Sequence, residues 1–149
     1  MTTSFRYEPG GATQVLLDSQ LNSLAASTGS AVGSTVWDNS AQGNQYFWGD
    51  FELLVTYGTA PTAGQTCDLY MIESVDGTNY ADGSATIQVA SHYIGSFVLR
   101  AVNTAQRITI RGVPLPPCKF KLELLNGAGQ AMAASGNQVQ ALLYRTQGI

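Results

Sequence analysis

The chain has 149 residues, only 11% of them charged, and a formal net charge of −3. This length is typical of a single domain that builds its own apolar core. The seven basic residues are spread along the chain without forming a basic stripe, which argues against a nucleic-acid-binding protein. No apolar run approaches the about 20 residues of a membrane span, so we expect no membrane segment.

Residues 1–34 are predicted to form an extended N-terminal arm and linker. Pro9-Gly10-Gly11 blocks regular structure there. Phe5, Arg6 and Tyr7 are side chains of the kind enriched at protein interfaces, so they are our candidate partner-binding residues; a disordered start is the alternative. The absence of an apolar signal core at this end favours synthesis in the cytoplasm.

The same segment contains one candidate helix. Leu17, Leu21 and Leu24 have i, i+4, i+7 spacing, and Asp18 or Ser19 could cap its start, so we expect at most one short helix. A Ser/Gly/Thr-rich linker, Ser27–Gly33, follows it.

Residues 35–149 are predicted to form the body, in which strand-like segments alternate with turns. Val36–Trp37 begins the pattern, and Gly49-Asp50 marks a possible bulge in the first long segment. The longer predicted strands are Tyr46–Tyr57, Cys67–Ser74, Ala85–Val89, Gly95–Val102, Arg107–Val113, Cys118–Leu125 and Asn137–Tyr144.

The stretch Cys67–Tyr80 shows this organisation most clearly. Its first half carries apolar residues on both faces of a strand, which is typical of a central strand. Asp76-Gly77 then predicts a tight turn, because glycine tolerates positive φ and aspartate can bond the backbone ahead of it. About eight strands at short spacing, with almost no helix, predict an all-β fold: an antiparallel β-sandwich that is jelly-roll-like.

The titratable residues do not form a recognisable catalytic motif. His92 is the only histidine, so a surface or packing role is favoured over catalysis. The densest acidic group is Asp68, Glu73, Asp76 and Asp82; paired carboxylates can hydrolyse glycosides, and residues 76–82 faintly resemble a calcium loop without its glycine and closing glutamate. We predict that the protein is not an enzyme and that it needs no cofactor or metal.

Aromatic residues offer an alternative binding surface. Sugar binding could use rings on one face of the sandwich, although strand aromatics more often pack in the core or across strands. The candidates are Trp37, Tyr46, Trp48, Tyr57, Tyr70 and Tyr80. Arg100, Arg107 and Arg111 could gather on one sheet face, either in solvent or against a subunit or acidic partner.

Cys67 and Cys118 are the only cysteines, and each begins a strand-like run. A domain of this size does not need a disulfide to fold, so we expect two buried thiols; one disulfide is the alternative.

Two segments carry a family resemblance. The first is Ser74–Tyr80, and the second begins at Arg111-Gly112-Val113-Pro114-Leu115-Pro116-Pro117-Cys118-Lys119-Phe120-Lys121 and continues through Asn126 to Ala133–Asn137. Together they resemble small structural proteins of tailed bacteriophages, over about Tyr46–Tyr144.

The resemblance implies a non-enzymatic capsid decoration, or cement, protein of the virion surface, with a jelly-roll-like body that is usually a homotrimer. Its expected partner is the major capsid protein, whose shell it would stabilise. The alternative function is a carbohydrate-binding β-sandwich module of a phage head or tail fibre.

Overall fold

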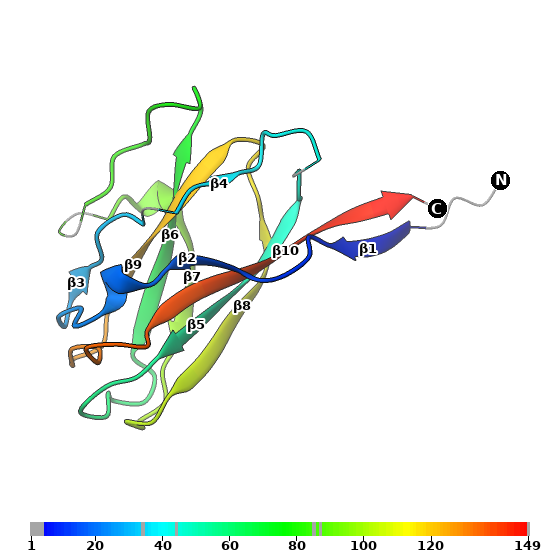
Figure 1. Cartoon of the computed structure of the whole chain (residues 1–149). Helices are drawn as coiled ribbons and strands as arrows, with labels where there is room; N and C mark the ends of the chain where they lie inside the picture. The colour runs from blue at the N-terminus through cyan, green and yellow to red at the C-terminus, as the bar shows by residue number, and fades with distance from the viewer. Residues whose placement is uncertain (1–4, 34, 44, 85, 87, 149) are drawn as a thin grey trace.

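A computed structural model describes residues 5–33, 35–43, 45–84, 86 and 88–148. The chain is 47% strand and 4% helix. Its two antiparallel sheets pack face to face (Figure 1), which confirms the predicted all-β sandwich.

The first sheet is organised around its longest strand, β10. Strand β5 pairs along one edge of β10, whereas β1 and β2 pair with successive stretches of the other edge, and β8 lies beyond β5. The strands of this sheet are β1 (Phe5–Pro9), β2 (Gln14–Leu17), β5 (Trp48–Val55), β8 (Gln106–Pro114) and β10 (Gln138–Gly148).

The second sheet has β9 and β6 at its centre. Two short strands, β3 and β4, pair with successive parts of β9, and β7 pairs with β6. Its strands are β3 (Thr28–Gly29), β4 (Trp37–Asp38), β6 (Thr66–Ser74), β7 (Tyr93–Val98) and β9 (Lys119–Asn126). Two single 3-10 turns, η1 (Ser19–Leu21) and η2 (Ala90–His92), are the only helical elements in the described residues.

The order of pairing is nested. β6 pairs with β7, β5 with β8, β3 and β4 with β9, and β2 with β10. An antiparallel pair rolled up on itself in this way gives the jelly-roll-like arrangement that the sequence predicted. The extra strand, β1, lies outside this nested set.

The core forms because alternate residues of the long strands point between the sheets. The predicted inward sets of β9 (Phe120, Leu122, Leu124) and β10 (Val139, Ala141, Leu143) are all buried. The predicted bulge is also present, because the β5–β8 register shifts between Gly49 and Phe51. The expected turn after β6 has Gly77 at φ +75°.

The segment 14–33 departs from the expected arm and linker, because it is part of the sandwich. β2 and β3 pair with β10 and β9, and Leu16, Leu17 and Leu21 are buried in the core. The leucine spacing gives only the 3-10 turn η1, since the backbone is already extended at Asn22. Strands this short show no periodicity of their own, so sequence pattern did not reveal them.

Two predicted strands differ from the observed structure. Ala85 and Ile87, in the predicted strand Ala85–Val89, lie outside the described residues, and the described residues of that range form no strand. β7 ends at Val98, before the predicted end at Val102. There the side chain of Gln106 bonds both the N–H (2.9 Å) and the carbonyl (3.2 Å) of Arg100, so the chain turns instead of extending.

Asn126, at the end of β9, is a buried polar residue whose hydrogen bonds join three parts of the chain. It is fully buried, and it ties the core to the segment before β3 and to the β9–β10 connection. Its amide donates to the carbonyl oxygens of Leu24 (3.1 Å), Ala25 (3.1 Å) and Gln130 (2.9 Å), and its Oδ1 accepts from Ala128 N and Tyr57 Oη (both 3.2 Å).

We therefore expect Asn126→Ala to lower the free energy of unfolding by at least about 3 kcal/mol, because several buried polar groups would lose their partner at once. Urea denaturation followed by tryptophan fluorescence measures this loss. Asn103→Ala is the control: Asn103 is exposed, and its replacement should change stability by less than about 0.5 kcal/mol. A similarly small effect at Asn126 would contradict the structural role.

Candidate partner-binding surface

β1 and the end of β10 form a two-stranded ribbon that projects from the sandwich (Figure 1). Their register runs from Pro9↔Tyr144 to Phe5↔Gly148. β5 pairs with β10 only as far as Tyr144. Residues 145–148 of β10 therefore have a neighbouring strand on one edge alone, and the ribbon (residues 5–9 and 144–148) continues the first sheet beyond its core.

The ribbon has two chemically different faces, because alternate side chains point to opposite sides. One face carries Tyr7, Pro9 and Tyr144, while the other carries the polar pairs Arg6–Gln147 and Glu8–Arg145. The aromatic face is continuous with the outer face of the first sheet, where Trp48 is the cross-strand partner of Tyr144.

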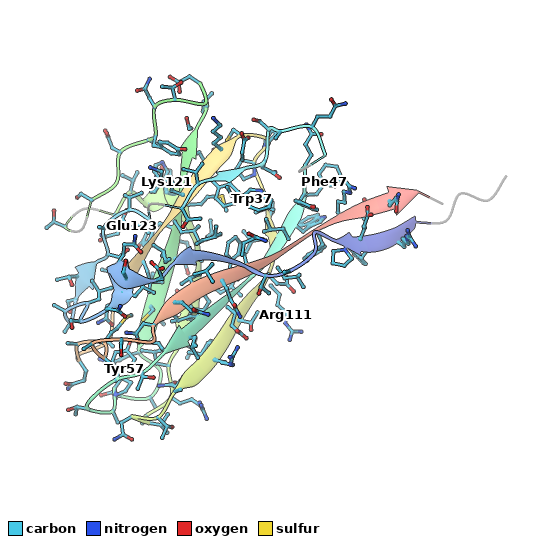
Figure 2. All side chains as sticks on the ribbon, in the orientation of Figure 1. Trp37, Phe47, Tyr57, Arg111, Lys121 and Glu123 are labelled. Atoms are coloured by element: carbon cyan, nitrogen blue, oxygen red, sulfur yellow. The ribbon has the colours of Figure 1, made fainter. Side chains whose placement is uncertain are left out.

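These apolar side chains form an aromatic patch, defined here as Tyr7, Pro9, Trp48, Leu142 and Tyr144. The rings of Tyr7 and Tyr144 meet edge to face, with centroids 5.7 Å apart. The patch borders two adjoining hollows of about 320 and 210 Å³. Tyr7 is 72% exposed and Trp48 37% exposed, so large rings stand in solvent here. Phe47, which is 53% exposed, lies beside the base of the ribbon (Figure 2).

Tyr144 is held in place by a polar contact at the border of the patch, on the same face of the sheet. Its hydroxyl donates to Asp50 Oδ1 at 3.2 Å, and the same oxygen accepts from the N–H of Gly112 at 2.9 Å. Burial raises the pKa of Tyr144, and the neighbouring Asp50 carboxylate raises it further. The hydroxyl of Tyr144 is therefore a neutral hydrogen-bond donor, and its bond to Asp50 fixes the position of the ring.

The opposite face of the ribbon is anchored by charge. Arg145 Nε donates to Glu8 Oε2 at 2.8 Å, and this bond raises the pKa of the guanidinium. Arg145 also lies over the ring of Tyr46, 5.7 Å from its centroid. A Cβ on Gly10 would come within 2.6 Å of the same ring, so glycine lets Tyr46 pack against the backbone where the ribbon begins.

The predicted partner-binding residues thus lie on the ribbon but do not act as one cluster. Tyr7 belongs to the aromatic patch, while Arg6 is exposed on the opposite face and donates to Gln147 at 3.0 Å. Phe5 pairs through its backbone, and its side chain lies outside the described part of the chain. The sequence did not reveal Trp48 and Tyr144 as neighbours of Tyr7, because the β5–β10 register brings them together.

The predicted acidic candidates are not assembled into a site. Asp76 organises its own turn by accepting from the N–H groups of Thr78 (2.8 Å) and Asn79 (2.7 Å), and these bonds lower its pKa to about 2. Asp68 accepts from Ser96 Oγ at 2.6 Å. Within the described ranges, no group of three His, Cys, Asp or Glu residues lies close enough together to hold a metal ion. Glu73, Asp82 and His92 are therefore not part of such a group.

Most of the candidate sugar-binding rings serve in packing. Tyr57 and Tyr70 are buried, and Trp37 packs against the half-buried Tyr46 with centroids 5.9 Å apart. Tyr80 lies under the amine of Lys121, 4.3 Å from the ring centroid. Trp48 alone of the six combines a position on the outer face of the first sheet with substantial exposure.

The arginine candidates separate into two groups. Arg107 and Arg111 are exposed on β8 (Figure 2 labels Arg111), and Arg107 pairs with Glu52 at 2.6 Å. Arg100 lies outside β8, in the turn after β7.

No family model, curated protein or solved structure matches this chain. Among the described residues, no helix has the length and apolar character required to cross a bilayer. The functional argument therefore depends on the residues of the chain and on their arrangement.

Both cysteines are free thiols, as predicted, but only Cys67 is fully buried. Burial raises its pKa to about 11. At pH 8 we expect iodoacetamide to modify Cys118 in the folded protein and to modify Cys67 only after unfolding, because the thiolate is the reactive form. Mass spectrometry of peptides measures this difference. Equal labelling of both thiols in the native state, or a disulfide between them, would contradict it.

Proposed function

We propose that this chain is a capsid decoration protein of a tailed-bacteriophage virion, which binds the major capsid protein and stabilises the shell. The observation that carries the proposal is the ribbon with its exposed aromatic patch. Tyr and Trp are enriched at the centres of protein interfaces, where large rings are buried at little cost in side-chain entropy.

The geometry of the ribbon also favours a protein partner. An isolated two-stranded ribbon is at best marginally stable in water, so a second surface that covers it would stabilise it. The unpaired edge of residues 145–148 offers backbone groups to a further strand. A rigid sandwich that carries such a ribbon can present it to a repeating shell.

The symmetry of a shell makes modest contacts sufficient. Each homotrimer would carry three ribbons that bind the shell together. Linked contacts raise the avidity without requiring a stronger individual contact. The low charge of the chain, in which 11% of residues are charged, suits surfaces shared between subunits, because burying unpaired charge is costly. A capsid-surface location in the virion follows from the same proposal.

The test is binding of the purified protein to undecorated capsids, measured by co-sedimentation and electron microscopy. We expect the full chain to bind, and Tyr7→Ala to weaken binding at least about tenfold, as for an interface anchor worth more than 1.4 kcal/mol. Light scattering of the free protein measures the expected trimer.

Tyr93→Ala is the matched control, because Tyr93 is a 48% exposed tyrosine of the second sheet, outside the aromatic patch. It should bind as the wild type does, and circular dichroism checks that both variants are folded. If the full chain does not bind capsids, the decoration role fails. If only the effect of Tyr7→Ala is missing, the ribbon is not the contact and the decoration role stands.

A second candidate function, carbohydrate binding, is favoured by the surroundings of Trp48. A hollow of about 140 Å³ on the same sheet face adjoins the patch through Leu142. It is lined by Asp50, Glu52 and Gln140. Their planar carboxylate and amide groups can bond sugar hydroxyls while the indole ring of Trp48 stacks on a sugar ring. Glu52 is already positioned by bonds from Arg107 (2.6 Å) and Gln140 (2.7 Å).

For this function we expect specific hits on a glycan array that disappear with Trp48→Ala and survive with Trp48→Phe, which keeps an aromatic face for stacking. Thermal melting should show that both variants remain folded. An array without hits for the wild type excludes the carbohydrate function and leaves the decoration role untouched.

A further inference from the structure

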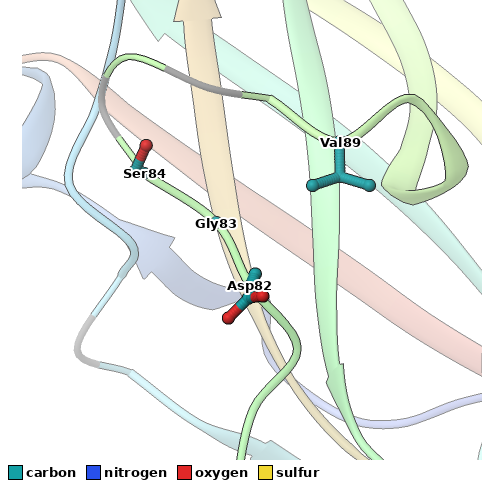
Figure 3. Close-up of a pocket in the computed structure, with 4 residues that line it drawn as sticks. All are labelled: Asp82, Gly83, Ser84 and Val89. Atoms are coloured by element: carbon teal, nitrogen blue, oxygen red, sulfur yellow. The ribbon is translucent and has the colours of Figure 1, made fainter.

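Glu123 is a buried carboxyl on the outer face of the second sheet, remote from the ribbon. It lies in β9 opposite Tyr70 of β6, and its exposed fraction is 0%. The connection after β6 covers it: an added Cβ on Gly83 would lie 2.8 Å from Glu123 Oε2 and 3.0 Å from Ile72. Figure 3 shows Asp82–Ser84 passing over the strands of this sheet, beside Val89. We call Val75–Ser84 the covering segment.

The hydrogen bonding of this carboxyl is incomplete. Oε1 accepts from Gln88 Nε2 at 3.1 Å, whereas Oε2 is buried without a hydrogen-bond partner in the described part of the chain. An unsatisfied buried oxygen costs about 1–3 kcal/mol when neutral and more when it carries charge. The closed arrangement therefore favours the neutral carboxyl.

Among the described residues, none of the groups packed around Glu123 supplies a compensating positive charge. Lys121, two residues away on β9, directs its amine to the ring of Tyr80. From β6 the facing group is the phenol of Tyr70, which packs against Tyr93 of β7 and lies near Asp68. The covering segment adds Tyr80 and the carboxylate of Asp82. In the described residues no ion pair includes Glu123.

We propose that Glu123 is a pH-sensitive latch for the covering segment: the neutral carboxyl lets Gly83 seat on the sheet, and the ionised carboxylate favours release of the segment into solvent. Opening requires water to reach Oε2. A hollow of about 450 Å³, bordered by Asp82, Gly83, Ser84 and Val89, lies directly beside the contact and supplies that route.

The direction of the pH effect follows from linkage. Burial raises the pKa of Glu123 in the closed form, and the hydrogen bond from Gln88 offsets part of this rise. Closure is therefore fully stabilised below the pKa of an exposed glutamate, and the stabilisation is lost as the pH rises through the closed-form pKa. Each pH unit between the closed-form and open-form pKa values changes the opening equilibrium about tenfold.

Hydrogen exchange of the backbone amide of Ala81, which belongs to the covering segment and donates to Glu73 O of β6 at 2.9 Å, tests this latch between pH 4 and pH 8, after correction for intrinsic rates. In the wild type we expect protection to fall as the pH rises and then to level off. In Glu123→Gln, which keeps the size and the acceptor for Gln88 but does not ionise, we expect protection to stay constant. The same pH dependence in both proteins would overturn the proposal.

Asp82→Asn is the matched control. It removes an exposed carboxylate from the covering segment itself, and it should retain the pH dependence of the wild type. If Glu123→Gln does not fold, the carboxyl ¹³C resonance of Glu123 in the wild type decides the question. A midpoint at or below that of an exposed glutamate would overturn the latch, and a higher midpoint with parallel loss of amide protection would support it.

Discussion

The hydrogen bonding of β10 is the constraint on which the rest of the molecule depends. One edge of this strand pairs with β5, and the other is divided between β2 and β1. The first part of β10 thus pairs with β5 and β2 inside the sandwich, and its last part pairs with β1 to form the ribbon. Because β10 is one continuous strand, the direction of the sheet sets the direction of the ribbon. Tyr144 lies where the sheet and the ribbon meet, since it pairs with Trp48 of β5 and with Pro9 of β1.

The aromatic patch follows from this arrangement. Trp48, Tyr144 and Tyr7 come from three strands, and only the pairing of β10 with both neighbours places their rings together. Asp50, on the same outer face of the sheet, fixes the hydroxyl of Tyr144, while Arg145 and Glu8 pair on the opposite face of the ribbon. The patch is therefore exposed and held in place, which suits docking against a surface.

Two buried polar side chains of β9 show how local hydrogen bonding separates rigid from adjustable regions. Asn126 satisfies partners on several segments, and these bonds make its surroundings resistant to opening. Glu123, three residues earlier, has one bonded oxygen and one without a partner among the described residues. The same strand can thus hold one end of the sandwich firmly and leave the covering segment responsive to pH.

The sequence by itself determined the all-β class, most long strands, the bulge after Gly49 and the Asp76-Gly77 turn, because alternation and turn chemistry act over a few residues. It also singled out Tyr7. It did not predict that residues 14–33 join the sandwich, that Trp48 and Tyr144 accompany Tyr7, or that Glu123 is buried. Those features arise from strand register and from a connection folding over a sheet, and such pairings between distant segments leave no local pattern.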